Sequence, residues 1–193
     1  VGNSLLSFIS KVSSGYWNIL DPTNGFTAIH ADVIQRLPVE KLDEGFFFES
    51  DLLYHLNGIR AVVVDVPMSA RYLGESSNLR IRKVGFEFLL KHILNTFKRL
   101  SYSYFLRNLN IASIELFLGL FLFLGGLRNG MNLWLEAAER SQAAPSGSVM
   151  LAAVPLILGT QLLLAFFAYD MQNVPSRPIH RGAVKSRSKT LLP

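Results

Sequence analysis

The sequence contains no cysteine, which excludes disulfide bonds and thiolate metal sites. Residue 1 is Val instead of Met, and nothing near the N-terminus resembles a secretory signal peptide, so we expect a fragment or a trimmed chain. Acidic residues are absent after Asp170, where five Lys and Arg residues follow. This composition predicts a disordered basic tail over residues 171–193.

Charge and hydropathy are unevenly distributed along the rest of the sequence. Residues 1–79 hold five Lys and Arg against nine Asp and Glu, whereas residues 80–107 hold seven basic residues and one acid, Glu87. The mean hydropathy of +0.29 is high for a soluble domain. Because the basic charge flanks apolar segments, the pattern favours an anionic lipid membrane over nucleic acid as the partner.

Two long apolar runs, residues 109–127 and 149–169, approach the roughly 20 residues that cross a hydrocarbon core. The loop between them, 128–148, has no net charge, and both outer flanks are basic. The positive-inside rule therefore places both termini in the cytoplasm. We expect a two-span transmembrane hairpin over 109–170.

The first apolar run contains one acid and several glycines. The single carboxylate of Glu115 offers no continuous polar pathway, so we expect it to serve packing or an interface rather than transport. Gly119, Gly125 and Gly126 permit close helix contact, either within the hairpin or between the subunits of a homo-oligomer.

Residues 83–107 combine apolar residues at helical spacing with a mostly polar opposite face. The apolar set is Phe86, Leu89, Leu90, Ile93, Leu94, Phe97 and Leu100. A core-packing helix of a soluble domain has the same pattern. Because a hydrophobic run follows at once, we favour amphipathic membrane-interface helices over 80–108.

The first 79 residues mix strand-like and helix-like patterns. Residues 26–29 and the β-branched run 61–68 predict strands, the second of them buried. Residues 49–58 predict a helix, and residues 32–37 predict one or two helical turns. We therefore expect an α/β domain over 1–79.

Glu49 and Asp51 are the strongest candidates for chemistry. Two carboxylates two residues apart, entering a helix, are able to act as a base or to orient a sugar hydroxyl or a metal shell. Acids in a first helical turn also interact with the helix dipole, and that simpler interpretation stays open. His55, four residues after Asp51, has the character of a surface or packing histidine rather than a ligand.

The stretch before the amphipathic segment has the composition of a binding loop. It carries Arg71, Ser76, Asn78 and Arg80, together with a glycine. Such a loop is able to hold a phosphate. A solvated connector is the alternative, and the sequence leaves both open.

A third candidate follows a loop predicted at Ser13-Ser14-Gly15. Tyr16 and Trp17 lead into a turn of Asp, Pro, Asn and Gly that contains Asn24. Rigid turns with aromatic side chains are able to form the floor of a sugar or lipid-phosphate site. A purely structural turn is equally compatible with the residues.

Taken together, these stretches resemble the family 2 inverting glycosyltransferases and are similar to those that act on dolichyl or polyprenyl phosphates. The resemblance covers about residues 13–180. It rests on Gly15-Tyr16-Trp17, Asp21-Pro22-Thr23-Asn24-Gly25-Phe26, Glu49-Ser50-Asp51-Leu52-Leu53, Val66-Pro67 and Arg71-x-x-Gly74-Glu75-Ser76, in that order, followed by two spans.

The resemblance implies the C-terminal portion of a GT-A, Rossmann-like catalytic domain that uses a nucleotide sugar, a polyprenyl phosphate acceptor and a divalent metal, Mg²⁺ or Mn²⁺. It assigns Asp51 to the acceptor and reacting sugar, and Arg71 to a phosphate. The family's Asp-x-Asp metal motif lies upstream of the matched region, and this sequence contains no Asp-x-Asp. We therefore expect the metal ligands to lie mostly outside this chain and this polypeptide to be inactive alone.

Two functions remain in competition. The first is transfer of a sugar from a nucleotide sugar to a polyprenyl phosphate at the cytoplasmic face. The second is a non-catalytic membrane anchor or interaction module. A small channel or transporter is disfavoured, because two spans with one acid provide no polar lining.

Overall fold

The computed structural model describes residues 2–67 and 81–179. It divides into two compact units. The first takes in the described residues up to Ser103 and those from Asn173 onward, and the second is Tyr104–Gln172. The predicted interface helix therefore belongs to the same unit as residues 2–67, and the predicted hairpin lies within the other.

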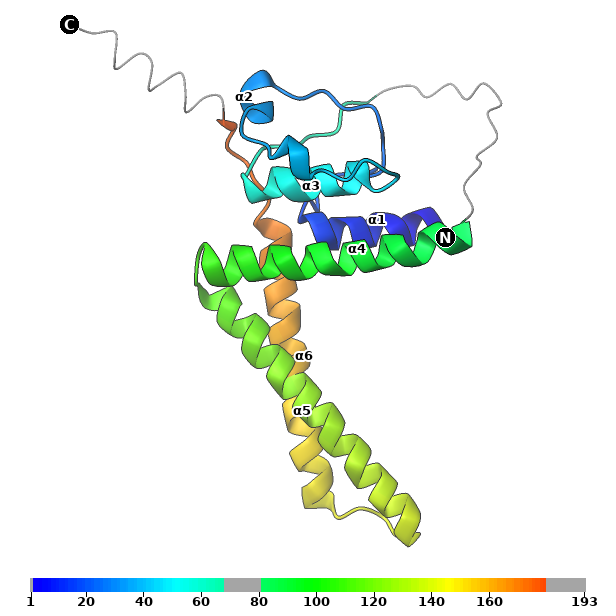
Figure 1. Ribbon diagram of the computed structural model, residues 1–193. Coiled ribbons are helices and arrows are strands. Elements are labelled where there is room, and N and C mark those ends of the chain that lie inside the picture. The colour runs from blue at the N-terminus through cyan, green and yellow to red at the C-terminus, as the bar shows by residue number, and fades with distance from the viewer. Residues whose placement is uncertain (1, 68–80, 180–193) are drawn as a thin grey trace, which may run out of the picture. The chain divides into compact units, whose positions relative to one another are not determined.

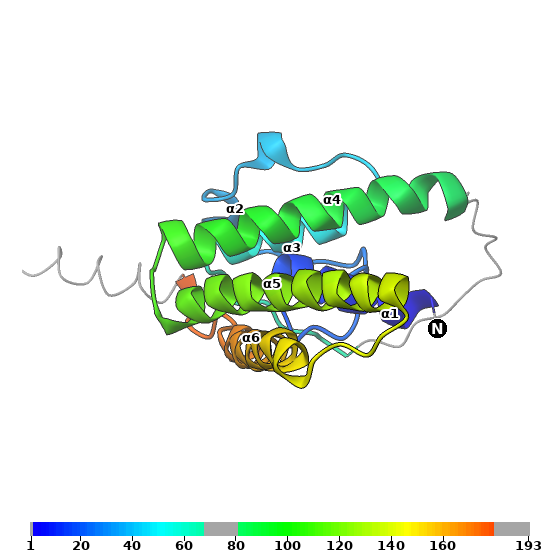
Figure 2. The ribbon, with the colours of Figure 1, turned by 90° about the horizontal axis from the view of Figure 1, so that it is seen from below.

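The first unit is built from helices. They are α1 (Gly2–Ser14), α2 (Ala31–Ile34), the short 3₁₀ helix η1 (Val39–Lys41), α3 (Phe48–Gly58) and α4 (Ile81–Ser101). Helix α1 packs against both α3 and α4, and α3 also contacts α4 (Figure 1, Figure 2). These three helices form the framework on which the irregular segments of the unit rest.

The predicted α/β fold is wrong, because the described residues contain helices and no strand. Residues 26–29 and 61–67 have strand-like sequences, yet neither forms a hydrogen-bonded ladder with any described residue. A strand forms only where a neighbouring backbone pairs with it, and local sequence does not supply that partner. The second segment is not buried as predicted, since Val64 and Val66 are exposed. Met68 lies outside the described residues.

The helix predictions fared better because helical hydrogen bonds are local. The structure confirms the helix predicted at 49–58, which is α3, and a long helix within the range predicted at 80–108, which is α4 and ends at Ser101. The turns predicted at 32–37 are confirmed only as α2. Helix α1 was missed, and Ser13 and Ser14 close it instead of forming a loop. Serine is a weak helix former, and its tertiary contacts compensate here.

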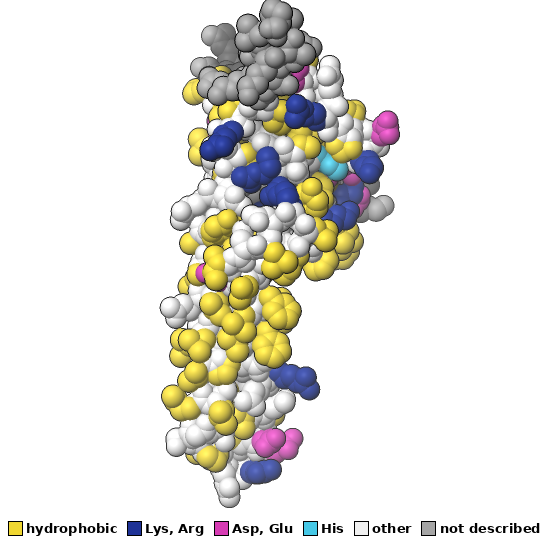
Figure 3. All heavy atoms as spheres, turned by 90° about the vertical axis from the view of Figure 1, so that its left-hand side faces the viewer, with side chains coloured by type: hydrophobic (Ala, Val, Ile, Leu, Met, Phe, Trp, Pro, Cys, Tyr) yellow, Lys and Arg dark blue, Asp and Glu magenta, His cyan; other side chains and the backbone are white. Residues whose placement is uncertain are grey.

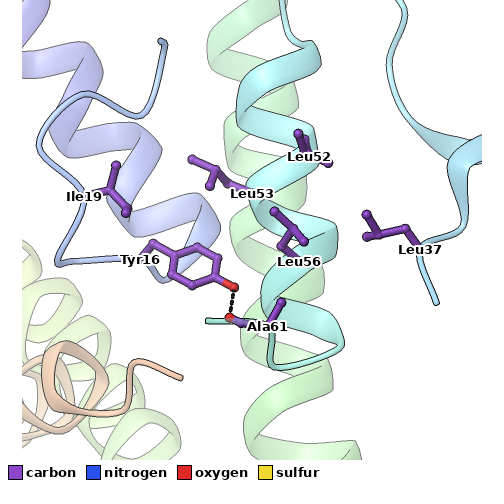
Figure 4. Close-up of a cluster of buried hydrophobic side chains, with 7 residues drawn as sticks. All are labelled: Tyr16, Ile19, Leu37, Leu52, Leu53, Leu56 and Ala61. Carbon is purple, nitrogen blue, oxygen red and sulfur yellow. Dashed lines mark hydrogen bonds between the residues drawn. The ribbon is translucent and has the colours of Figure 1, made fainter. Parts of the chain in front are cut away.

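A small apolar core connects α3 to the segments around it (Figure 4). It consists of Tyr16, Ile19, Leu37, Leu52, Leu53, Leu56 and Ala61. The hydroxyl of Tyr16 donates a hydrogen bond of 2.6 Å to the carbonyl of Ala61. This bond satisfies the one polar atom of an otherwise apolar buried ring.

The second unit is a helical hairpin of α5 (Ile111–Arg140) and α6 (Ser146–Gln172), which lie side by side (Figure 1). One turn of π-helix, η2 (Tyr102–Leu106), precedes it. The predicted loop at 128–148 is wrong in extent, because α5 continues to Arg140 and leaves only residues 141–145 as a connector. Good helix formers and an ion pair of 3.8 Å between Glu136 and Arg140 favour this continuation.

Both hairpin helices are long and apolar enough to cross a membrane. Only 22% of the most apolar window of α5 and 17% of that of α6 is buried inside the protein. On the face drawn in Figure 3, hydrophobic side chains predominate along the hairpin, and charged ones gather toward its connector end. A core helix of a soluble protein would instead bury most of this surface.

Glycines set the contact between α5 and α6. A Cβ atom placed on Gly126 would lie 2.7 Å from the Leu156 nitrogen, and one on Gly119 would lie 3.1 Å from the Leu163 nitrogen. Gly159 on α6 is equally close to the backbone of α5. Gly125, by contrast, has open space around it. Of the three glycines noted in the sequence, two therefore serve the hairpin itself.

Candidate functional site

Glu49 and Asp51 both lie on α3, but the structure directs them to different places. Asp51 is buried and points into the contact between α3 and α4. Glu49 is half-buried and lines an open cavity, with its Oε1 atom 3.5 Å from a Cβ placed on Gly25. Residues two apart on a helix are separated by about 200° around its axis. The two carboxylates therefore do not form one paired site.

The carboxylate of Asp51 joins three segments of the first unit. Its Oδ1 atom accepts a hydrogen bond of 2.9 Å from the side-chain amide of Asn95 on α4. Its Oδ2 atom accepts one of 3.0 Å from the backbone N–H of Asp43, in the loop before α3. Both oxygens are thus engaged by neutral donors, as expected for a carboxylate that holds elements together.

His55 lies one turn further along α3, with its Nε2 atom 3.6 Å from Asp51 Oδ2. Burial lowers the pKa of His55, and the nearby carboxylate of Asp51 partly offsets this effect. The imidazole is therefore neutral at neutral pH. This agrees with the packing role that its sequence position predicted.

A charged link reinforces the same contact between the loop and α4. Lys91 on α4 forms ion pairs with Asp43 and, at 3.0 Å, with Glu87 one turn away. The hydrogen bond from Lys91 lowers the pKa of Asp43, and the same bond raises the pKa of Lys91. The loop that leads into the Glu49-x-Asp51 helix is thus tied to α4 by both its backbone and its side chain.

Buried serines attach α1 to the other two helices. Ser10 shares a hydrogen bond of 3.0 Å with Ser50 on α3, and Ser13 Oγ lies 2.7 Å from His92 Nδ1 on α4. His92 is 1% exposed and is flanked by the rings of Phe47 and Phe88. Burial lowers the pKa of His92 to about 4, so the ring is neutral at physiological pH.

In α4 the polar face is buried and the apolar face is exposed, which is the reverse of an ordinary helix in a soluble domain. Its polar residues His92, Asn95 and Arg99 are buried. Its apolar residues are exposed, and two of them, Phe86 and Phe97, are each 73% exposed. The remainder of the exposed apolar face is Leu89, Leu90, Ile93 and Leu94. A contiguous exposed apolar face of this kind marks a surface that a partner protein or a lipid membrane covers.

The turn candidates divide between the core and the cavity. Tyr16 is fully buried, and burial raises the pKa of its hydroxyl. Trp17 packs edge-on against Phe8 of α1, at 6.0 Å between ring centroids. Asn24 is exposed, lines the cavity, and accepts a hydrogen bond of 3.0 Å from the Phe26 N–H. Of the three predicted residues, Tyr16 and Trp17 are therefore packed against the protein, and Asn24 lines the cavity.

The open cavity has a volume of about 670 Å³ and lies within the first unit. Its floor is the apolar face of α3 with Leu52, Leu53 and Leu56, and its walls are the two segments 26–29 and 61–66. A volume of this size suits a small ligand or a short stretch of polypeptide. Of the predicted site residues, the structure brings Glu49 and Asn24 together here.

Arg71, Ser76, Asn78 and Arg80 lie outside the described residues. Among the residues that are described, no group of three His, Asp or Glu side chains has the arrangement of a metal site. The divalent metal that the family resemblance implies, with its ligands mostly outside this chain, stays a prediction.

Sequence reasoning missed the buried polar residues that organise the site. Their signal was a stripe at His92, Asn95 and Arg99, spaced by three and four residues on one face of a helix. In the sequence alone, such a stripe indicates the solvent-facing side of an amphipathic helix. Its burial depends on contacts with distant residues such as Ser13 of α1.

Comparison of the chain with protein-family models, curated proteins and solved structures found no match. The resemblance to family 2 glycosyltransferases therefore stays a prediction.

Proposed function

We propose that this chain is the membrane-bound, acceptor-side part of a glycosyltransferase that uses a nucleotide sugar and a polyprenyl phosphate. The observation that supports it most is the direct connection between the Glu49-x-Asp51 helix and α4. Asn95 and Lys91 of α4 hold Asp51 and the loop before α3, while the other face of α4 is apolar and exposed. A lipid surface that takes up this face lies next to the candidate site.

Helix α4 is suited to the head-group region of a bilayer. Burial of a phenylalanine side chain in an apolar medium contributes about 1.5–3 kcal/mol, and α4 offers Phe86 and Phe97 among several large apolar residues. Each basic residue near an anionic leaflet adds about 1 kcal/mol. With α5 and α6 as spans, we place both ends of the chain on the cytoplasmic side, as the basic flanks favour.

Within the proposed site, the two acids have different roles. A lipid phosphate is already an anion near neutral pH, so it needs little deprotonation before it attacks a sugar. Asp51 positions α3 on α4 through its hydrogen bond from Asn95 and holds the loop before α3 through its hydrogen bond from the Asp43 N–H. Glu49 faces the cavity and is the carboxylate able to contact a substrate hydroxyl. Arg71 is the proposed partner of the acceptor phosphate.

Lipid binding by the full chain in nanodiscs tests this proposal. We expect native mass spectrometry to detect polyprenyl phosphate bound in preference to polyprenol. Arg71→Ala is expected to weaken that binding about tenfold, because a charge-assisted contact contributes about 1.5–3 kcal/mol. Arg36→Ala, at an exposed position, is the matched control. Equal binding of both lipids, unaffected by Arg71→Ala, would contradict the proposal.

A non-catalytic membrane module is the second candidate. It is favoured by the engagement of both Asp51 oxygens in contacts between elements, since this is the acid that the family resemblance assigns to the reaction. This function requires membrane association but no preference for a phosphorylated polyprenyl lipid. The same nanodisc measurement therefore separates the two.

A further inference from the structure

Two segments with strand-like sequences meet at the cavity, and neither is paired. Residues 26–29 and 61–66 both line it, yet within the described residues no backbone ladder involves them. Their β-branched and aromatic composition favours strands wherever a partner backbone is present. The two segments thus have the composition of strands, and within the described residues they lack a neighbouring backbone with which to pair.

The segment from Ala61 to Asp65 is held along one edge only. The carbonyls of Ala61 and Val63 accept hydrogen bonds from Tyr16 Oη and Asn18 Nδ2, and Asp65 Oδ2 accepts one from the Leu20 N–H. The two backbone carbonyls that accept these bonds, those of Ala61 and Val63, are two residues apart, as on one edge of an extended chain, whereas the Asp65 contact is made by its side chain. Backbone groups of successive residues in such a chain point to opposite edges.

The other edge belongs to Val62, Val64 and Val66. No hydrogen bond to their backbone groups is present among the described residues. The side chains of Val64 and Val66 are 67% and 70% exposed, and Phe26 across the cavity is 84% exposed. A row of unpaired N–H and C=O groups beside exposed apolar residues is a template for the addition of another strand.

Charge defines the kind of strand that fits. Asp21, Glu49 and Asp65 line the cavity, and no Lys or Arg is among the described residues that line it. A strand that enters is therefore favoured when it carries basic residues toward these carboxylates and apolar residues toward Leu52 and Leu56.

From these observations we infer that the cavity is a docking site for an extended strand of a partner polypeptide, which pairs with the open edge of residues 62–66. The strand alternates apolar residues, which fill the cavity, with basic residues, which face its acidic rim. Only a backbone satisfies a row of backbone donors and acceptors, so a lipid tail or a sugar leaves this edge unpaired. The inference does not depend on sugar transfer.

A fluorescent peptide of about eight alternating Val and Lys residues is a suitable probe. The full chain is held in nanodiscs of zwitterionic lipid, so that the Lys residues do not bind the bilayer, and empty nanodiscs give the background. We expect saturable binding by fluorescence anisotropy and slower amide exchange at Val62 and Val64. A peptide with alternate backbone nitrogens methylated along one edge is expected to bind at least about tenfold more weakly.

Val64→Pro removes one N–H from the open edge, and Val64→Thr keeps that N–H and the branched side-chain shape. Because the Val64 backbone forms no hydrogen bond with any described residue, we expect both variants to retain the melting temperature of the parent chain. Peptide affinity is expected to fall about tenfold for Val64→Pro and to change less than about twofold for Val64→Thr.

Three results would overturn the inference. The peptide does not bind at about 1 mM, the methylated peptide binds equally well, or the two Val64 variants have equal affinity for the peptide. Displacement of the peptide by polyprenyl phosphate would assign the cavity to the lipid instead. Failure of the peptide to bind leaves the preference for a lipid phosphate unaffected, so the two proposals fail separately.

Discussion

At the scale of single residues, polar side chains carry much of the contact between α1, α3 and α4. Asp51 accepts two hydrogen bonds from neutral donors, and His92 is packed between aromatic rings with a serine at its Nδ1 atom. Buried polar groups are costly when a partner is lost. Substitutions here are therefore expected to change stability before they change chemistry.

We expect Asp51→Asn to destabilise the first unit by about 1–3 kcal/mol, because its new amide N–H₂ would face an existing donor. Glu49→Gln, on the cavity side, is expected to change the stability by less than about 0.5 kcal/mol. Urea unfolding in detergent, followed by hydrogen exchange of the α3 amides, measures both. Equal stability of the two variants would show that Asp51 does not join the elements. Loss of activity in Asp51→Asn alone does not identify a catalytic residue.

The pH dependence of stability is expected to report His92. Its pKa is about 4 in the folded chain, against 6.5 for a free histidine. The unfolded chain therefore binds the proton more readily. The stabilising contribution is complete above about pH 6.5 and is lost as the pH falls toward 4, with a slope of at most about 1.4 kcal/mol per pH unit.

Unfolding free energies measured at about pH 7.5, 6 and 5 give this slope. His92→Gln retains a hydrogen-bonding side chain and is expected to flatten the slope. His55 titrates in the same sense, so the difference between the parent chain and His92→Gln isolates one ring. An unaltered slope in His92→Gln would contradict the assignment.

At the scale of elements, α4 and the hairpin helices all expose large apolar side chains, but they differ in the residues that they bury. Helix α4 buries polar residues and exposes an apolar face. Helices α5 and α6 expose apolar residues on most sides and approach each other through glycines. Under the proposed function, the first pattern is the one expected of an interface helix, and the second is the one expected of a spanning pair.

We expect a tryptophan at position 97 to contact lipid tails. In a background with Trp17 and Trp134 replaced by Phe, Phe97→Trp fluorescence is expected to be quenched in nanodiscs that contain brominated acyl chains. Glu44→Trp, in an exposed loop of the same unit, is the control and is expected to stay unquenched. Equal quenching at the two positions would remove α4 from the membrane interface.

Glycine substitutions test the hairpin contact. We expect Gly126→Leu or Gly159→Leu to force α5 and α6 apart and to lower the melting temperature in detergent by several degrees. Overpacking of this kind typically lowers the free energy of unfolding by roughly 1–3 kcal/mol. Gly125→Leu has open space and is expected to have little effect on the hairpin. If Gly125→Leu alone changed the oligomeric state, that glycine would belong to a contact between subunits.

At the scale of the whole molecule, the chain combines two candidate spans with flanks of basic charge. We expect it to remain in the membrane after carbonate washing and to have both ends on the cytoplasmic side. The absence of cysteine makes topology measurable with single introduced thiols. Release of the chain into the supernatant would contradict both expectations.

In oriented membrane vesicles, Gln142→Cys in the connector and Glu44→Cys in the first unit are expected to react with an impermeant maleimide from opposite sides. Both positions are exposed, so accessibility to the reagent does not limit either reaction. Labelling of both thiols from one side would show that α5 and α6 do not cross the bilayer as a pair.

The sequence by itself determined the elements whose signals are local. The spacing of Leu52, Leu53 and Leu56 predicted α3, the pattern from Phe86 to Phe97 predicted α4, and two apolar runs predicted α5 and α6. Helical hydrogen bonds and apolar spans depend on neighbours along the chain, so their periodicity is visible without a fold.

Only the tertiary structure decided what these elements face. It directed Glu49 and Asp51 to different places and turned the polar stripe of α4 toward α1 and α3. Among the described residues, it supplied no partner strand for residues 61–67. Each outcome depends on contacts between residues that are far apart in the sequence. A periodic pattern of apolar and polar residues indicates that an element has two different faces. Which of these faces is buried depends on the partner that packs against it.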